Sequence, residues 1–366
     1  MTDRFVANST RPSLAKARLG TPIALVLAWA LLAMIVPCRA FAHGPLPERW
    51  VPAECDWVVH IDAQRLARAQ ALRPVFDVLT ASTFGASLED MGIDARMDLT
   101  GITVFGTVTR GPEARGETTT LLQGGAALRD AIKSHVQAHG GYTLMLRQPD
   151  KSSGHRIDAW TIDSLAVHIA IVPVSASGTE EQPTSLVAVL SDNSHRLQAC
   201  IASLLTEDGS AEHEATQPQT GDDEPQDHFT HAPTPEGSVI SLYARGLNLA
   251  HPPLRSELLA SAERLVGHLG YREQGDSMVV FADLELQGHE QADLASVVSS
   301  LNRMIGYWGK RAAELGRQQP SMLHMLPLVQ ACDVSHEGRI VRISMEQAVE
   351  ADRPAQAAAG TREEDR

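Results

Sequence analysis

The sequence predicts an α+β protein built mainly from antiparallel sheets with helices packed on them, in two similar-sized halves. Short runs that alternate apolar and polar residues often come in adjacent pairs joined by short turns, which favours antiparallel pairing. Segments with helical spacing lie between these groups, and each has one apolar face to place on a sheet. An acidic stretch that is poor in large hydrophobic residues, at 206–237, separates the halves.

The N-terminus carries an export signal. Four basic residues precede the apolar run IALVLAWALLAMIV at 23–36, and Ala40-Phe41-Ala42 follows with small residues at the positions that a signal peptidase recognises. The run is shorter than the roughly 17–25 residues of a spanning helix, so an uncleaved membrane anchor is the minor alternative. We therefore expect a signal peptide at 1–42 and a periplasmic or extracellular chain that begins at His43.

The remaining chain is strongly acidic. The first 42 residues hold five basic residues and one acidic residue, which leaves 26 basic against 44 acidic residues and a formal charge of −18. Such a surface repels phosphate backbones, so a nucleic-acid partner is not expected. No further segment approaches spanning length, and we expect no integral membrane segment after signal cleavage.

The first half, 43–205, is predicted to be an α+β domain. The helices are expected at 63–72, 125–141 and 195–205, with a further helical turn opened by Pro74. The segments that read as strands are 57–62, 99–109, 118–124, 142–146, 155–162, 165–174 and 185–190.

The second half, 238–350, is predicted to be a second α+β domain. It opens with a strand at 238–247, which resembles the strand at 57–62 in its apolar pattern and suggests a distant duplication. A helix is expected at 252–269, where leucines recur at helical spacing, and another at 291–308. Two strand pairs turn at Gln274-Gly275-Asp276 and His336-Glu337-Gly338. The segment 206–237 is expected to be a disordered linker or loop, and 351–366 a disordered tail.

His60 and Asp62 are the strongest candidates for chemistry, because they follow a strand at a spacing that can bind a metal ion. The usual companions of such a site, as in H-E-x-x-H, are missing. Asp192 occupies a similar corner between a strand and a helix. We therefore interpret both aspartates as N-caps that accept backbone N–H groups of the first helical turn, and His60 as a half-buried strand residue.

Other histidines and the cysteines form no complete site. His135 and His139 are four residues apart on a predicted helix, a spacing that suits a metal, but Val136 stands where a zincin has glutamate. His213, His228 and His231 lie among carboxylates in the predicted linker. Removal of the signal peptide with Cys38 leaves an odd set, Cys55, Cys200 and Cys332, which contains no C-x-x-C, and spacing does not choose between a Cys55–Cys200 and a Cys200–Cys332 bridge.

The start of the mature chain resembles a group of uncharacterised exported bacterial proteins. These proteins have a leucine-proline stretch, a W-V-x-H-x-D strand, and then a D-x-x-G-[IV]-T-x-[FY]-G strand. The matching residues are Leu46, Pro47, Trp57, Val58, His60, Asp62, Asp98, Gly101, Ile102, Thr103, Phe105 and Gly106. The resemblance implies export and architecture and assigns no catalytic residue.

These patterns favour an exported, non-enzymatic protein that binds an unknown protein or envelope component, or acts as a cell-envelope scaffold. No catalytic, cofactor-binding or metal residue is assigned, and no cofactor is expected. The alternative is a metal-dependent hydrolase of the cell envelope that uses His60 and Asp62, with His168 or His195 as a further ligand.

Overall fold

The structure is a computed structural model that describes residues 50–52, 54–69, 72–108, 117–144, 157–174, 185–205, 234–247, 261–274, 277–315 and 329–350. The predicted signal peptide, the predicted tail and residues 206–233 of the predicted linker lie outside this range.

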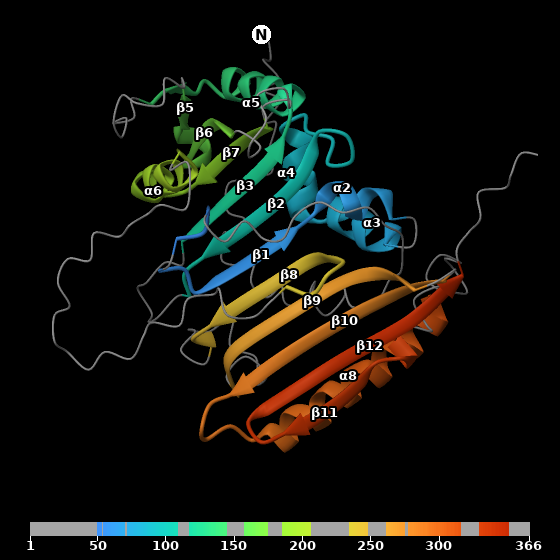
Figure 1. The fold of residues 1–366 in the computed structure, drawn as a ribbon. Coiled ribbons are helices and arrows are strands. Elements are labelled where there is room, and N and C mark those ends of the chain that lie inside the picture. The colour runs from blue at the N-terminus through green and yellow to red at the C-terminus, as the bar shows by residue number, and fades with distance from the viewer. Residues whose placement is uncertain are drawn as a thin grey trace, which may run out of the picture.

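Twelve strands form one antiparallel sheet, in the order β11-β12-β10-β9-β8-β1-β2-β3-β7-β6-β5-β4 (Figure 1). The predicted α+β class with mainly antiparallel strands is confirmed. The strands are β1 (Trp57–Ile61), β2 (Leu99–Gly106), β3 (Thr118–Gly124), β4 (Tyr142–Thr143), β5 (Asp158–Ile162), β6 (Val167–Val174), β7 (Ser185–Ser191), β8 (Ser238–Arg245), β9 (Ala262–Gln274), β10 (Ser277–Gly288), β11 (Asp333–Glu337) and β12 (Ile340–Glu350).

Helices lie on both faces of this sheet. They are α2 (Ala63–Arg68), α3 (Arg73–Ala81), α4 (Thr83–Asp90), α5 (Ala126–Ala138), α6 (Ser194–Leu205) and α8 (Leu294–Leu315), with a 3₁₀ turn at Asp163–Leu165. Helix α6 packs on β6 and β7, and α8 lies behind the β11–β12 end of the sheet in Figure 1. No helix among the described residues combines the length and apolar character that crossing a membrane requires.

The buried apolar side chains form two cores, one on each face of the sheet. Alternation along β1 places Trp57 and Val59 in one core and Val58 in the other. The first core packs beneath α2, α3, α5 and α8, whereas the second core packs beneath α6. The second core consists of Trp50, Cys55, Val58, Phe105, Leu121, Ala159, Ala170, Val172, Val187, Val189, Leu197, Cys200, Ile201, Leu204 and Tyr243.

The two predicted halves have the same strand order within the single sheet. The first strand of each half, β1 or β8, lies at the centre of the sheet. The next two strands of the chain, β2 and β3 or β9 and β10, follow it outward in order. A helix, α5 or α8, then follows in the chain, and the last strand of the half, β7 or β12, lies next to the third. The first strands, β1 and β8, pair antiparallel at the junction. This repeat is what a duplication would produce, and the duplication itself stays a prediction.

The helix predicted at 252–269 is wrong from Ala262 onward, where the chain forms strand β9. Its apolar residues Leu265 and Leu269 fit both periods, because residues four apart share one face in a helix and in a strand. Pairing with β8 on one side and β10 on the other decides for the strand. The segment 248–260 lies outside the described residues. The predicted turn between β11 and β12 is confirmed, and Gly338 there has φ 57°.

Candidate functional site

Asp62 ends strand β1 and caps helix α2, as predicted. Its Oδ1 accepts the backbone N–H of Arg65 at 2.8 Å, which satisfies one of the unpaired donors of the first helical turn. Its own backbone N–H donates to the carbonyl of Val239 at 2.8 Å. The residue therefore fixes the corner between β1 and α2 and contacts the start of β8.

The two strand motifs of the resemblance pair with each other in β1 and β2, whereas Leu46 and Pro47 lie outside the described residues. Trp57 lies opposite Gly106, and His60 lies opposite Thr103. A Cβ atom at Gly106 would lie 2.8 Å from Cζ2 of Trp57, so glycine is what allows the indole to pack there. The two motifs describe how these strands fit together, which is a structural role.

Four buried polar side chains form a row across the centre of the sheet, which we call the polar row: Thr103, His60, Ser241 and His268. They come from β2, β1, β8 and β9 and are direct cross-strand neighbours on the face of the second core. His60 Nδ1 lies 2.9 Å from Thr103 Oγ1, and His268 Nδ1 lies 3.2 Å from Ser241 Oγ. Each imidazole is thus hydrogen-bonded to a hydroxyl of the adjacent strand.

Both histidines of the polar row are neutral at pH 7. Burial lowers the pKa of His60 to about 4, and the same cause lowers the pKa of His268 to about 4. His60 is only 8% exposed, so it is a buried residue and the predicted half-buried position is wrong. The second neighbour, β8, completes this burial, because it places Ser241 against His60 on the side away from β2.

Arg65 connects the two halves on the opposite face of the sheet. Its Nε donates to Tyr271 Oη at 3.1 Å, and its Nη1 donates to the carbonyl of Ser238 at 3.2 Å. The guanidinium carbon lies 5.0 Å from the centre of the Tyr271 ring, and Nε lies 4.0 Å from Asp62 Oδ2. A buried cation of the first half is therefore held by residues of both halves.

The corner before α6 is capped by Asn193, so the predicted cap at Asp192 is wrong by one residue. Asn193 Oδ1 accepts the backbone N–H groups of His195 and Arg196 at 2.9 and 3.3 Å. Its amide nitrogen also donates to Glu117 Oε1 at 2.8 Å, which an aspartate would not do. Burial and then the nearby Glu117 raise the pKa of Asp192.

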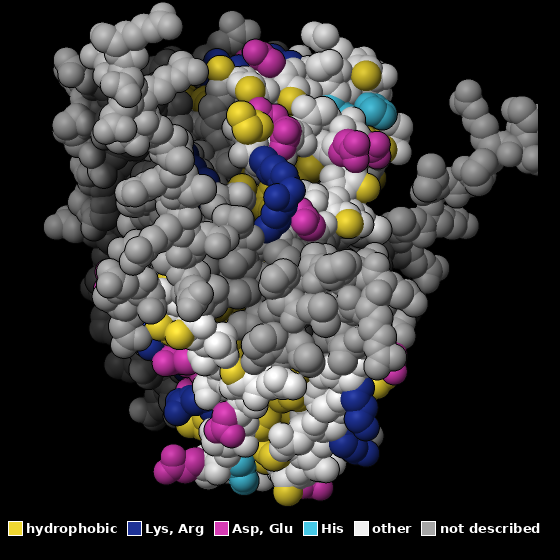
Figure 2. Space-filling model, turned by 90° about the vertical axis from the view of Figure 1, so that its right-hand side faces the viewer, with side chains coloured by type: hydrophobic (Ala, Val, Ile, Leu, Met, Phe, Trp, Pro, Cys, Tyr) yellow, Lys and Arg dark blue, Asp and Glu magenta, His cyan; other side chains and the backbone are white. Residues whose placement is uncertain are grey.

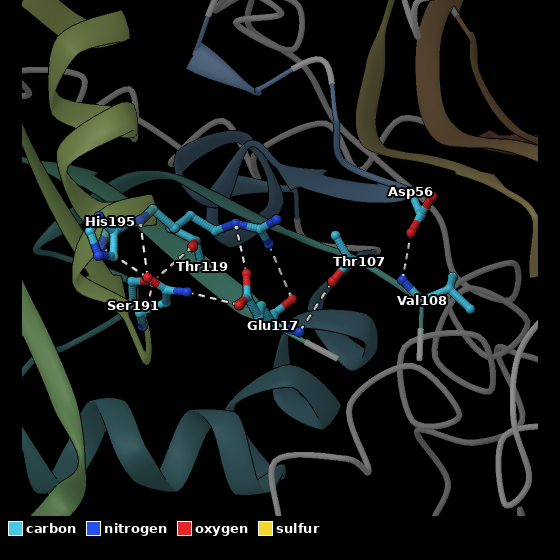
Figure 3. Close-up of polar contacts among 9 residues, drawn as sticks. Asp56, Thr107, Val108, Glu117, Thr119, Ser191 and His195 are labelled. Carbon is cyan, nitrogen blue, oxygen red and sulfur yellow. Dashed lines mark hydrogen bonds and ion pairs between the residues drawn. The ribbon is translucent and has the colours of Figure 1, made fainter. Parts of the chain in front are cut away.

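Polar contacts hold the strand ends around this corner and beyond it (Figure 3). Arg196, whose side chain is 9% exposed, places Nε 3.5 Å from Glu117 Oε2. Ser191 and Thr119 bring their hydroxyls to within 3.1 Å of each other across β7 and β3. The backbone N–H of Val108 donates to Asp56 Oδ2 at 2.7 Å. Each of these contacts joins a strand end to a neighbouring element.

The remaining histidine candidates are separate from His60. His135 Nδ1 lies 3.3 Å from the carbonyl of Asp90, and His139 Nδ1 lies 3.0 Å from the carbonyl of His135, so the two stacked rings are engaged with backbone. His168 lies on β6 and is bonded to Thr161 at 2.9 Å. His195 lies in the first turn of α6. His213, His228 and His231 lie outside the described residues.

The three cysteines among the described residues are free thiols. Cys55 and Cys200 are fully buried in the second core, and Cys332 is partly buried. Burial raises the pKa of the Cys55 and Cys200 thiols to about 12. Both therefore stay protonated at neutral pH in the folded chain.

Among the described residues, no three His, Cys, Asp or Glu side chains converge as ligands for one metal ion. Sequence reasoning found His60 and Asp62 but missed Ser241 and His268. His268 was placed in a helix, and Ser241 was placed in a strand whose neighbours were not predicted. Arg264 and His268 share one face of β9, but the apolar Val266 between them interrupts the polar pattern.

Comparison with known proteins gives a low-similarity match to solved structures. No family model and no curated protein matches the chain. Crystal form III of TP0453 matches with a TM-score of 0.41 and 12% identity over 84% of this chain and 95% of that chain. Crystal form I of TP0453 matches with a TM-score of 0.37 and 12% identity, over 85% and 95% of the two chains.

Proposed function

We propose that the protein is an exported, non-enzymatic protein of the cell envelope that binds another protein or an envelope component through its sheet. The supporting observation is that His60 and Asp62, which would begin a hydrolase site, both make hydrogen bonds that hold the fold. A neutral imidazole on a threonine and a carboxylate on a helix N–H are common structural arrangements.

The surface proposed for binding is the open face of β9, β10 and β12, which we call the charged face. It carries exposed ion pairs between neighbouring strands, Arg272 with Glu346 and Arg342 with Glu285. Their side chains are between 38% and 60% exposed. Exposed pairs of this kind add little stability, so they are free to exchange partners with a second molecule. Basic and acidic side chains alternate across these strands, which suits a polar protein surface better than a polyanion. Figure 2, which views the molecule from the side, also shows both kinds of charge on the lower part of the surface.

Photo-crosslinking in intact cells tests export and binding together. A crosslinking amino acid in place of Arg272 or Arg342 is expected to give one discrete higher-mass species in the envelope fraction. N-terminal sequencing of that species is expected to begin at His43. The matched control is the same amino acid at Met97, which is 81% exposed but lies in the first half, away from the charged face.

Two results would contradict this proposal. An intact Met1 in the membrane fraction would show that the signal segment is retained. Identical adduct patterns at Arg272, Arg342 and Met97 would show that the charged face binds nothing specifically.

Replacement of Asp62 tests the non-enzymatic role. Asp62→Ala is expected to lose about 1 kcal/mol for the cap and to lose also the carboxylate beside Arg65. Asp62→Asn keeps the acceptor but not the charge, so its unfolding free energy should lie between those of Asp62→Ala and the wild type. Thermal melts with and without a chelator measure both effects, and the chelator should leave every melting point unchanged.

Ser82→Ala is the matched control, because Ser82 Oγ caps α4 by accepting the N–H of Gly85 and has no charged partner there. It should cost about 1 kcal/mol, as a cap alone does. The metal-dependent hydrolase would be favoured if a chelator lowers the melting point of the wild type but leaves the melting points of both Asp62 variants unchanged.

A further inference from the structure

The polar row crosses the junction at which the two halves share the sheet. Strand β1 is 5 residues long, whereas β9 and β10 are 13 and 12 residues long. The β1–β8 ladder therefore covers only Trp57–Ile61 against Ile240–Ala244. Two of the buried side chains at this short ladder, His60 and Ser241, lie directly opposite each other.

His60 has only neutral groups opposite it on the two adjoining strands. Thr103 faces it from β2, and Ser241 faces it from β8. On its own chain, Val58 lies two residues before it and Asp62 two residues after it, where the carboxylate is engaged with the first turn of α2. A proton on His60 would thus place a positive charge in a buried position that has no carboxylate across either strand.

Asp283 on β10 is the carboxylate directly opposite His268, and it also lies close to an arginine. Ser241 faces His268 from β8, and the Tyr243 ring lies edge-on with its centre 5.5 Å away. Asp283 faces it from β10, but Arg342 Nε lies 3.9 Å from Asp283 Oδ1. On its own strand, Arg264 and Arg272 lie four residues to either side on the same face. Arg272 and Arg342 are also paired with Glu346 and Glu285 on this face, so a proton on His268 would add positive charge where the neighbouring carboxylates are already engaged with arginines.

We propose that the polar row makes the junction between β1 and β8 acid-sensitive, so that acidification opens the sheet there and separates the two halves. Charged imidazoles at these two buried positions of β1 and β9 would lie two strand spacings apart, about 10 Å, on one face of the sheet, where like charges repel. The Arg65 guanidinium on the other face stays charged throughout the acid range. This acid sensitivity does not depend on which partner the charged face binds.

The sign of the effect follows from the two lowered pKa values. Each histidine binds a proton near pH 6.5 in an opened or unfolded chain, but only near pH 4 in the closed sheet. The closed sheet is therefore fully favoured above pH 6.5 and becomes less stable as the pH falls from 6.5 to 4. Between pH 7 and pH 5, the opening equilibrium should rise about 20-fold for each histidine that opening exposes.

Hydrogen exchange of the protein, purified as cells produce it, tests the proposal. Protection factors corrected for the intrinsic exchange rate are measured by mass spectrometry at pH 7 and pH 5. Peptides that cover β1 and β8 should lose at least about 20-fold more protection than peptides that cover β3 and β12. Equal losses in all four strands, or unchanged protection in β1 and β8, would overturn the proposal.

The variant His60→Asn tests whether the loss of protection at pH 5 comes from the histidine or from other groups that titrate. Asparagine places a polar atom near the position of Nδ1 but does not titrate, so the excess loss in β1 and β8 should shrink about 20-fold. The matched control is His168→Asn, which removes an equivalent histidine–hydroxyl pair away from the junction and should leave the excess loss unchanged. If His60→Asn does not fold, His60→Gln gives the same comparison, because its amide does not titrate either. An undiminished excess loss in the variant that folds would overturn the proposal.

Discussion

Arg65→Leu is expected to destabilise the protein by about 3–5 kcal/mol, the loss found when one partner of a buried charge pair is removed. The change leaves Asp62 Oδ2 without the guanidinium 4.0 Å away, and it removes the donor to the buried Tyr271 hydroxyl. It also removes the donor to the Ser238 carbonyl at the start of β8. Urea unfolding at pH 7 measures the effect.

The matched control is Arg68→Leu, three residues further along α2, because Arg68 is exposed. That change should stay within about 0.5 kcal/mol of the wild type. Tyr271→Phe should cost about 1 kcal/mol, since it removes one hydrogen bond and keeps the ring beneath the guanidinium. The double variant Arg65→Leu, Tyr271→Phe should cost less than the sum, because both changes remove the same contact. Additive costs would show that the two side chains act independently.

Local patterns predicted the first strand and its corner well. The apolar, β-branched run in WVVHI and an aspartate at the next position were enough to predict β1 and the cap of α2, because both depend on neighbours within four residues. The hairpin of β11 and β12 was predicted for the same reason, from a glycine with positive φ at the turn. The prediction of the α6 cap was wrong by one residue, since both Asp192 and Asn193 suit that position. Asn193 is the cap because its amide nitrogen can also donate to Glu117.

The polar row could not be predicted from the chain, because its members are brought together by pairing over long separations. Thr103 lies 43 residues from His60, and His268 lies 27 residues from Ser241. Nothing near His60 in the sequence shows that β8 will lie on its other side. Likewise Arg65 reaches Tyr271, 206 residues away, although its local pattern indicates only an arginine in the first turn of a helix.

The strand that was predicted as a helix owes its position to a close approach of backbones at Gly270. This residue lies opposite Ser238 at an irregularity of the β8–β9 ladder. A Cβ atom there would lie 2.7 Å from the Gly237 carbonyl carbon and from Ser238 Cα, well inside van der Waals contact. Gly237 has φ 90°, and its carbonyl accepts the N–H of Tyr271 at 3.1 Å. The start of β8 therefore packs so closely on Gly270 of β9 that no side chain fits there.

Gly270→Ala is accordingly expected to destabilise the protein by about 3 kcal/mol, the upper part of the range for overpacking, because the atoms that must move are backbone. The Gly237–Tyr271 hydrogen bond should weaken first, and Tyr271 is also the residue that Arg65 contacts. Urea unfolding of the variant gives the free energy, and hydrogen exchange of peptides over β8 and β9 shows where protection is lost.

Gly306→Ala in α8 is the matched control, since no atom lies within 4 Å of the added methyl group. Alanine is the better helix former, so this variant should be more stable than the wild type by about 0.5–1 kcal/mol. The two substitutions add the same methyl group, but Gly270→Ala should lower the free energy of unfolding and Gly306→Ala should raise it. The unfolding free energies of the two variants should therefore differ by about 4 kcal/mol. A Gly270→Ala variant as stable as the wild type would show that β8 and β9 do not approach each other in this way.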